Sequence, residues 1–162
     1  MLNRRLFGVV LAGAVLTGGA FAQAAVKHHV SQTIKLSAIS QSATYPSPGS
    51  KDVDAGIVTG TPGRGAVVQH ITITGHPTAT TYTFKGTSTG FYAHGTTRGS
   101  LTGTATALPT GGLTVTGHGH YTGGTNAYLG ARGKFSFTGS APPATPGKPA
   151  PLVAHVTGTL RY

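Results

Sequence analysis

Residues 117–139 constrain the fold more than any other part of the chain. Two strand-like runs flank the turn Gly123-Gly124-Thr125-Asn126 and the step Leu129-Gly130-Ala131-Arg132-Gly133 that follows it. Glycine at these places lets the backbone bend or adopt positive φ, as hairpin connections require. The segment therefore predicts two neighbouring antiparallel strands.

The rest of the chain also has the pattern of strands. Threonine, glycine and proline, which are poor in helix interiors, recur throughout, and helical apolar spacing is not sustained after the N-terminal run. Eight alternating runs bounded by turn residues are candidate strands: 30–39, 55–59, 66–74, 80–85, 97–108, 113–121, 133–138 and 152–160. They predict an all-β fold, an eight-stranded antiparallel up-and-down β-barrel, with a two-layer β-sandwich as the alternative.

Alternation within the runs assigns side chains to the two faces of the sheet. Val67, Gln69, Ile71 and Ile73 share one face, and His70 lies on the other. By the same rule the aromatic side chains should line the barrel interior: Tyr82, Phe84, Phe91, Phe135 and Phe137. Because small eight-stranded barrels are usually packed solid, the favoured interpretation is that these rings fill the interior. Small residues accompany them, however, so a small apolar pocket in which Tyr82, Phe84, Phe135 and Phe137 bind a ligand is the alternative.

The N-terminus has the charge order of a secretory signal. Arg4 and Arg5 precede an uncharged apolar run at residues 6–21, and Ala22 ends a small-x-small triplet. We expect a signal peptide at 1–22, or cleavage after Ala24, then one barrel domain at 23–162 with a Pro-rich loop at 141–151. The protein should be secreted or periplasmic, without a membrane span once the signal is removed. An uncleaved anchor is the alternative, and Arg4-Arg5-Leu6-Phe7 resembles a twin-arginine signal, although the general secretory route is favoured.

The charge and the cysteine content of the chain limit which partners and which metal sites are expected. The chain has 12 Lys and Arg against two acids, Asp52 and Asp54, and no cysteine, so disulfides and thiolate metal sites are excluded. This excess favours polyanionic neighbours such as lipid headgroups or envelope polymers. The basic residues are spread singly along the sequence, so no nucleic-acid partner is expected.

Histidine is the main candidate for acid–base or metal chemistry. His118 and His120 share a face of one run, and a metal site would need a third ligand such as His155 or His70. The favoured alternative places His118 and His120 on the solvated face beside threonines. We expect no cofactor.

Several glycine-rich motifs resemble the allene oxide cyclase and dirigent-like barrel superfamily, in particular its small secreted bacterial members. The resembling segments are Gly123-Gly124-Thr125-Asn126-Ala127-Tyr128-Leu129-Gly130-Ala131-Arg132-Gly133, residues 56–65, residues 99–104 and the ending Gly158-Thr159-Leu160-Arg161-Tyr162. The resemblance implies an eight-stranded barrel with an apolar interior, and in some relatives a trimer, so an oligomer is an open alternative.

The resemblance also bears on chemistry, because the plant cyclases and dirigent proteins use acidic residues in their cavities. Here glutamate is absent and both aspartates precede the predicted second strand, so a cavity carboxylate is not expected unless Asp54 points inward. The main functional prediction is a non-enzymatic binder of a small apolar ligand, or an extracellular interaction module. The alternatives are a cyclase or isomerase using Asp54, His70 or Tyr82, and an envelope-attached protein that binds anionic polymers.

Overall fold

The computed structural model describes residues 26–38, 47–143 and 151–162. The expected signal peptide and most of the expected Pro-rich loop lie outside these residues. The described elements are β1 (Lys27–Ala38), β2 (Lys51–Thr61), β3 (Gly65–Gly75), β4 (Thr81–Tyr92), β5 (Gly95–Ala107), β6 (Leu113–Gly124), the short 3-10 helix η1 (Asn126–Tyr128), β7 (Arg132–Ala141) and β8 (Leu152–Arg161).

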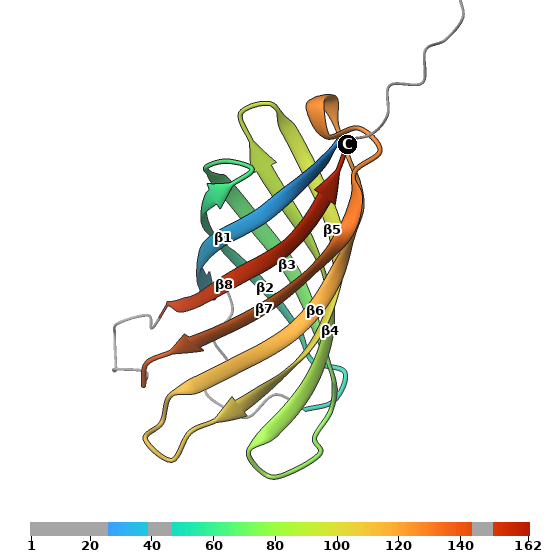
Figure 1. Ribbon diagram of the computed structural model, residues 1–162. Helices are drawn as coiled ribbons and strands as arrows, with labels where there is room; N and C mark the ends of the chain where they lie inside the picture. Colours follow the sequence, from blue (N-terminus) through green and yellow to red (C-terminus); the bar gives the residue numbers. More distant parts are fainter. Residues whose placement is uncertain (1–25, 39–46, 144–150) are drawn as a thin grey trace, which may run out of the picture.

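The strands form a closed antiparallel barrel in chain order (Figure 1). Each strand pairs with the next, and β8 closes the barrel on β1 through pairs such as Val30 with Gly158. The predicted fold is confirmed and the sandwich alternative is not the structure. Closure leaves no strand edge with unpaired backbone groups.

One end of the barrel is closed by side chains from the motif that the sequence marked as a hairpin. The β6–β7 connection forms η1, with Asn126 at φ 53° and Gly130 at φ 74°. Tyr128 from η1 is buried beside Val30 and Leu160. Its ring lies 5.5 Å from that of Tyr92 and 4.9 Å from that of Tyr162, between ring centroids. We call this the closed end.

Glycines on the inner faces of β5 and β6 make room for three phenylalanine rings. A Cβ added at Gly119 would lie 2.4 Å from Cζ of Phe135, and one added at Gly117 would lie 2.4 Å from Cζ of Phe137. At Gly103 an added Cβ would lie 2.7 Å from Cζ of Phe84. Each ring therefore lies against bare backbone, so it covers the barrel wall.

Phe91 is the exception among the aromatic residues expected inside. It lies on the outer face of β4 and is 46% exposed, because the inner positions of this part of β4 are Ser88, Gly90 and Tyr92. The prediction that Phe91 lines the interior is wrong. The polar and glycine residues of this stretch concealed the strand's continuation beyond Lys85.

Replacing Gly119 with alanine should destabilise the barrel by about 2–3 kcal/mol. The new methyl group would meet the Phe135 ring and, at 2.3 Å, the backbone oxygen of Ser100. Urea unfolding measures the loss. Gly123→Ala on the same strand is the matched control, because the nearest atom to its Cβ is 3.7 Å away. Equal stability of the two variants would contradict this account of the wall.

Candidate functional site

A cavity of about 760 Å³ occupies the barrel interior. Its lining reaches Tyr92 and Tyr121 near the closed end and extends to Gly111 and Pro142, in the connections at the opposite end. We call that opposite end the mouth. The interior is therefore hollow, as eight-stranded barrels that hold one small ligand are.

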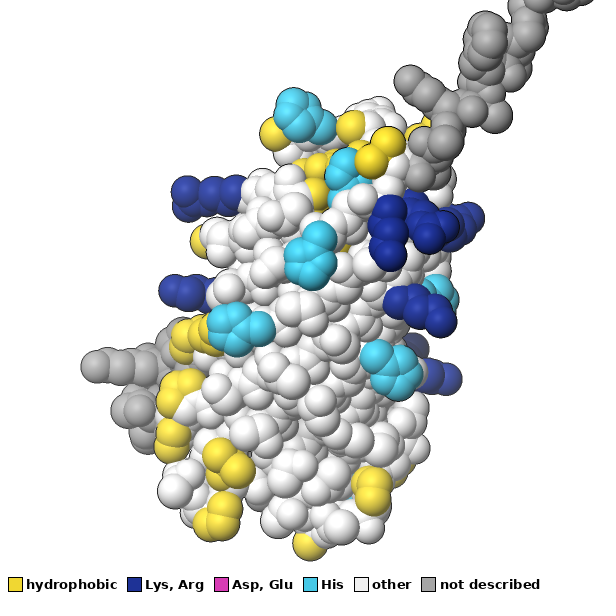
Figure 2. Space-filling model, in the orientation of Figure 1, with side chains coloured by type: hydrophobic (Ala, Val, Ile, Leu, Met, Phe, Trp, Pro, Cys, Tyr) yellow, Lys and Arg dark blue, Asp and Glu magenta, His cyan; other side chains and the backbone are white. Residues whose placement is uncertain are grey.

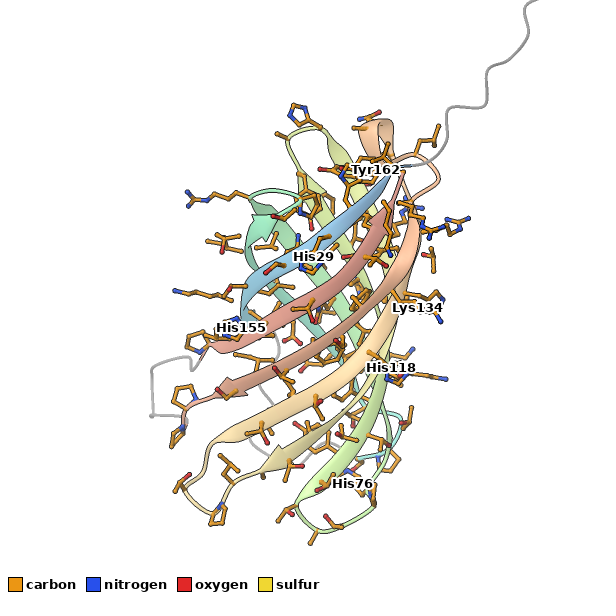
Figure 3. The ribbon with its side chains drawn as sticks, viewed as in Figure 1. His29, His76, His118, Lys134, His155 and Tyr162 are labelled. Atoms are coloured by element: carbon orange, nitrogen blue, oxygen red, sulfur yellow. The ribbon has the colours of Figure 1, made fainter. Side chains whose placement is uncertain are left out.

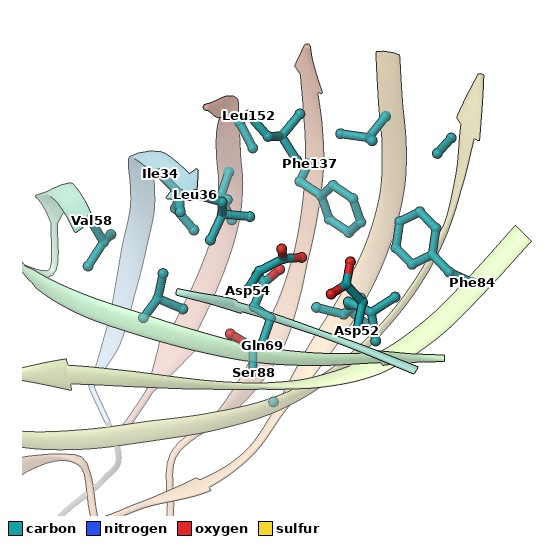
Figure 4. Close-up of a pocket in the computed structure, with 18 of the residues that line it drawn as sticks. Ile34, Leu36, Asp52, Asp54, Val58, Gln69, Phe84, Ser88, Phe137 and Leu152 are labelled. Carbon is teal, nitrogen blue, oxygen red and sulfur yellow. The ribbon is translucent and has the colours of Figure 1, made fainter. Parts of the chain in front are cut away.

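Both aspartates of the chain line this cavity (Figure 4). Strand β2 begins at Lys51, four residues earlier than the sequence suggested, so Asp52 and Asp54 lie on it at alternate positions with Val58 on the same inner face. The expectation that no carboxylate lies in the cavity is wrong, and its exception, an inward Asp54, is what the structure contains.

Asp54 belongs to a polar row that crosses three strands. It pairs in register with Gln69 on β3, and Gln69 pairs with Ser88 on β4. All three side chains line the cavity. Burial, with a further contribution from the charge of Asp52, raises the pKa of Asp54 to about 6. This carboxyl group therefore changes charge close to neutral pH.

Asp52 lies nearer the mouth than Asp54. Its Oδ1 accepts a hydrogen bond of 2.9 Å from the backbone N–H of Val53. Exposed Lys51 is beside it and is the one cation among the described residues that line the cavity. The ionised side chains of the lining thus carry two negative charges and one positive charge.

The wall that faces the carboxylates is apolar (Figure 4). Leu36, Leu152 and Val156 come from β1 and β8, and Phe84 and Phe137 complete this surface. The two phenylalanine rings are 6.3 Å apart between centroids and tilted by 32°. The cavity thus presents a polar strip on β2–β4 and aromatic and aliphatic surface opposite it.

The inner part of the cavity contains neutral hydrogen-bonding groups. Nε2 of Gln32 donates to the hydroxyl of Tyr92 at 2.9 Å. Burial raises the pKa of both Tyr92 and Tyr121, so their phenols stay protonated at neutral pH. No charge is added to the cavity at this depth.

The three catalytic candidates from the sequence separate into two groups. Asp54 and Tyr82 both line the cavity, and the Tyr82 ring lies 6.0 Å from that of His76 at the mouth. His70 lies outside, in a groove of about 460 Å³ on the outer wall that His118 and His120 also line. The candidate ligand-binding residues Phe84, Phe135 and Phe137 all line the cavity.

The candidate metal ligands do not form a cluster. His118 lies 3.4 Å from Oγ1 of Thr102, and His120 lies 3.1 Å from Oγ of Ser100. His155 is on β8 and lies 3.3 Å from the hydroxyl of Thr33, away from His118 on β6 (Figure 3). Within residues 26–38, 47–143 and 151–162, no three His, Cys, Asp or Glu side chains could hold a metal ion together.

Sequence reasoning missed Asp52 and Ser88 as cavity residues. Three apolar residues alternate with the inward-facing residues of β2, namely Val53, Ala55 and Ile57. From the sequence alone, this pattern predicts that the apolar residues face inward and the aspartates outward, which is the opposite of the structure. The inward position of Gln69 on β3 could have corrected this prediction. Directly paired residues on neighbouring strands point to the same face of a sheet, so the β2 residue that pairs with Gln69, Asp54, must also point inward.

No protein-family profile and no curated protein sequence matches the chain. Among solved structures it is similar to pyocyanin demethylase, with a TM-score of 0.44, 14% identity, and coverage of 83% of this chain and 99% of that chain. No family model supports the resemblance to the allene oxide cyclase and dirigent-like superfamily, which stays a prediction from the quoted motifs. No helix among the described residues is long and apolar enough to cross a membrane.

Replacing Asp54 with asparagine should stabilise the protein at pH 7.5 but not at pH 4. Because the pKa of Asp54 is raised from 3.8 to about 6 in the fold, ionisation costs stability that is fully lost above pH 6 and regained as the pH falls toward 3.8. Allowing for partial exposure, we expect a gain of about 1–2 kcal/mol at pH 7.5, or roughly 3–6 °C in Tm.

Thermal melts of both proteins across this pH range measure the difference in Tm. Every other side chain is the same in the two proteins, so the difference in Tm isolates the contribution of Asp54. A difference in Tm that is the same at both pH values would contradict the burial of Asp54 in the cavity.

Proposed function

We propose that the barrel binds one small, flat, largely apolar molecule that carries a basic nitrogen or another hydrogen-bond donor. The observation that carries this proposal is the position of the chain's two acidic side chains on one wall of a cavity whose opposite wall is apolar. The proposal names a charge and a shape for the ligand, and each has its own support.

The charge of the ligand is supported by the electrostatics of the lining. Asp52 and Asp54 repel each other, and burial makes ionisation of Asp54 unfavourable. A cation bound between Asp54 and the apolar wall would relieve both effects, because an opposite charge favours the ionised form. An anionic ligand would instead add a like charge in a weakly solvated space, which is costly.

The shape of the ligand is supported by the apolar wall. Phe84 and Phe137 present ring surface, and Tyr82 lies at the mouth. Aromatic faces attract flat rings and also organic cations held over them. A volume of about 760 Å³ is within the range of small-molecule sites. The N-terminal sequence supports action outside the cytoplasm, in the periplasm or the medium.

Fluorescent probes of different charge should bind in a fixed order. We expect proflavine, a flat cation, to bind more tightly than neutral N-phenylnaphthylamine, and that probe more tightly than its anionic relative anilinonaphthalene sulfonate. The Asp52→Asn, Asp54→Asn double variant should weaken proflavine binding about tenfold and strengthen binding of the anionic probe. Fluorescence titration measures all three affinities.

A cavity-blocked variant controls for binding elsewhere. Ser88→Phe places a ring in the cavity and should reduce binding of every probe without changing the outer wall. Proflavine binding that is unaffected by Ser88→Phe, or an anionic probe that binds best to the unaltered protein, would refute the proposal.

Acid–base catalysis in the same cavity is a second candidate, of the cyclase or isomerase type. It is favoured by the position of Asp54 inside the cavity, where burial raises its pKa to about 6, because a general base works best when its pKa lies near the working pH. Tyr82 is a second proton donor or acceptor on the lining. His70 takes no part in this candidate, since it lies on the outer wall.

Ring opening of nitrobenzisoxazole tests this second candidate. The reaction needs only a base: as the base takes the one carbon-bound proton of the isoxazole ring, the N–O bond breaks in the same step and a nitrile and a coloured phenolate form. We expect a rate above that of acetate buffer which rises with pH through about 6, as Asp54 ionises, and falls about 100-fold in Asp54→Asn. The same rate in both proteins would eliminate Asp54 as a base.

A further inference from the structure

The barrel wall separates the acidic side chains of this protein from the basic ones. Its two acidic side chains line the cavity, so the ionised side chains on the outer surface of the described residues are all basic. Six of the nine described cations lie in the half of the barrel nearest the closed end, as Figure 2 shows for one face. These six residues are Lys27, Arg64, Arg98, Arg132, Lys134 and Arg161.

Strand pairing brings three of these cations into one row. Arg161 on β8 pairs in register with Lys27 on β1 and with Arg132 on β7. All three are exposed. Like charges on directly paired residues destabilise a sheet, so the row carries an electrostatic cost that an anionic partner would remove. The sequence prediction that the basic residues are scattered does not hold for this row in the folded barrel.

Exposed apolar side chains lie at the same end. Leu129, just after η1, is 76% exposed, and Val26, just before β1, is 60% exposed. Phe91, also exposed, is next to the β4–β5 hairpin. This hairpin contacts η1, because the N–H of Ala127 donates a hydrogen bond to the backbone oxygen of His94. Large apolar side chains exposed beside cations are typical of surfaces that meet a lipid interface.

We propose that the closed end is a docking surface for an anionic lipid bilayer. The row of Lys27, Arg132 and Arg161 would contact the headgroups, and Leu129 and Val26 would enter the interface. The mouth of the cavity, at the other end of the barrel, would then face away from the bilayer and stay open to ligand. This orientation goes beyond the proposed ligand binding and does not depend on it.

The exposed apolar side chains favour a bilayer over a soluble polyanion. A polymer chain needs only the cations, whereas Leu129 and Val26, which are both exposed at this end, gain from contact with lipid.

Vesicle flotation with matched charge variants tests the docking surface. The eight strands that the structure describes lie within residues 27–161, so a chain starting at Gln23 keeps all of them. A cooperative thermal transition checks that this chain folds. We expect it to bind vesicles of mixed phosphatidylglycerol and phosphatidylcholine, but not phosphatidylcholine alone. Lys27→Gln with Arg161→Gln should weaken binding about 30-fold, at roughly 1 kcal/mol for each cation.

Lys35→Gln with Lys85→Gln is the control, because it removes the same charge from exposed residues outside the docking surface. It should weaken binding less than threefold. Leu129→Ser, with all cations kept, should weaken vesicle binding about tenfold and leave heparin binding unchanged. Equal losses of vesicle binding in the two double variants would refute the docking surface. If heparin bound as tightly as vesicles and Leu129→Ser had no effect on vesicle binding, the partner would be a soluble polyanion instead.

Discussion

The hollow interior of this barrel depends on phenylalanine rings that lie directly on glycine backbone. Gly117 and Gly119 of β6 have no side chain to separate Phe137 and Phe135 from the wall. If these positions carried even a methyl group, the rings would be displaced toward the barrel axis. Small barrels are usually filled by their own side chains, and here the rings cover the wall instead. The cavity of about 760 Å³ follows from this arrangement.

The cavity contains both acidic side chains of the chain. A chain with 12 basic residues and two acids would be expected to display both acids as solvated partners of its cations, yet both line the interior. Keeping a carboxylate there lowers stability, because burial disfavours its ionised form and so raises the pKa of Asp54. Residues kept at a cost to stability mark functional sites more often than structural ones. The outer wall, left without acidic side chains, becomes a positively charged surface.

Much of the fold could be predicted from the sequence because alternation is a local property. Tyr82, Phe84, Phe135 and Phe137 lie inside, as period-two spacing indicates. The motif around Gly123 and Gly124 does connect two neighbouring strands, although the sequence did not reveal that Tyr128 closes the end of the barrel.

The site was harder to predict because it depends on pairing between strands. On β2, Val53, Ala55 and Ile57 alternate with the inward aspartates and lie on the other face, the reverse of the usual pattern. Only the register of β2 with Gln69 on β3 shows this. The basic row has the same origin, because Lys27 and Arg161 are distant in sequence and meet only when β8 closes on β1. Neither contact is encoded in a local spacing.

Carbon-13 NMR of the aspartate side chains tests the central claim most directly. Because the chain has two acidic residues and both are aspartates, labelling aspartate gives two side-chain carboxyl signals that are followed as the pH changes. We expect the signal of Asp54, assigned by its loss in Asp54→Asn, to titrate near pH 6 and to shift to lower pH when proflavine is added. If Asp54 titrated near pH 4 and proflavine did not change this, its carboxylate would be exposed to water, which would contradict a buried carboxylate that binds a cationic ligand.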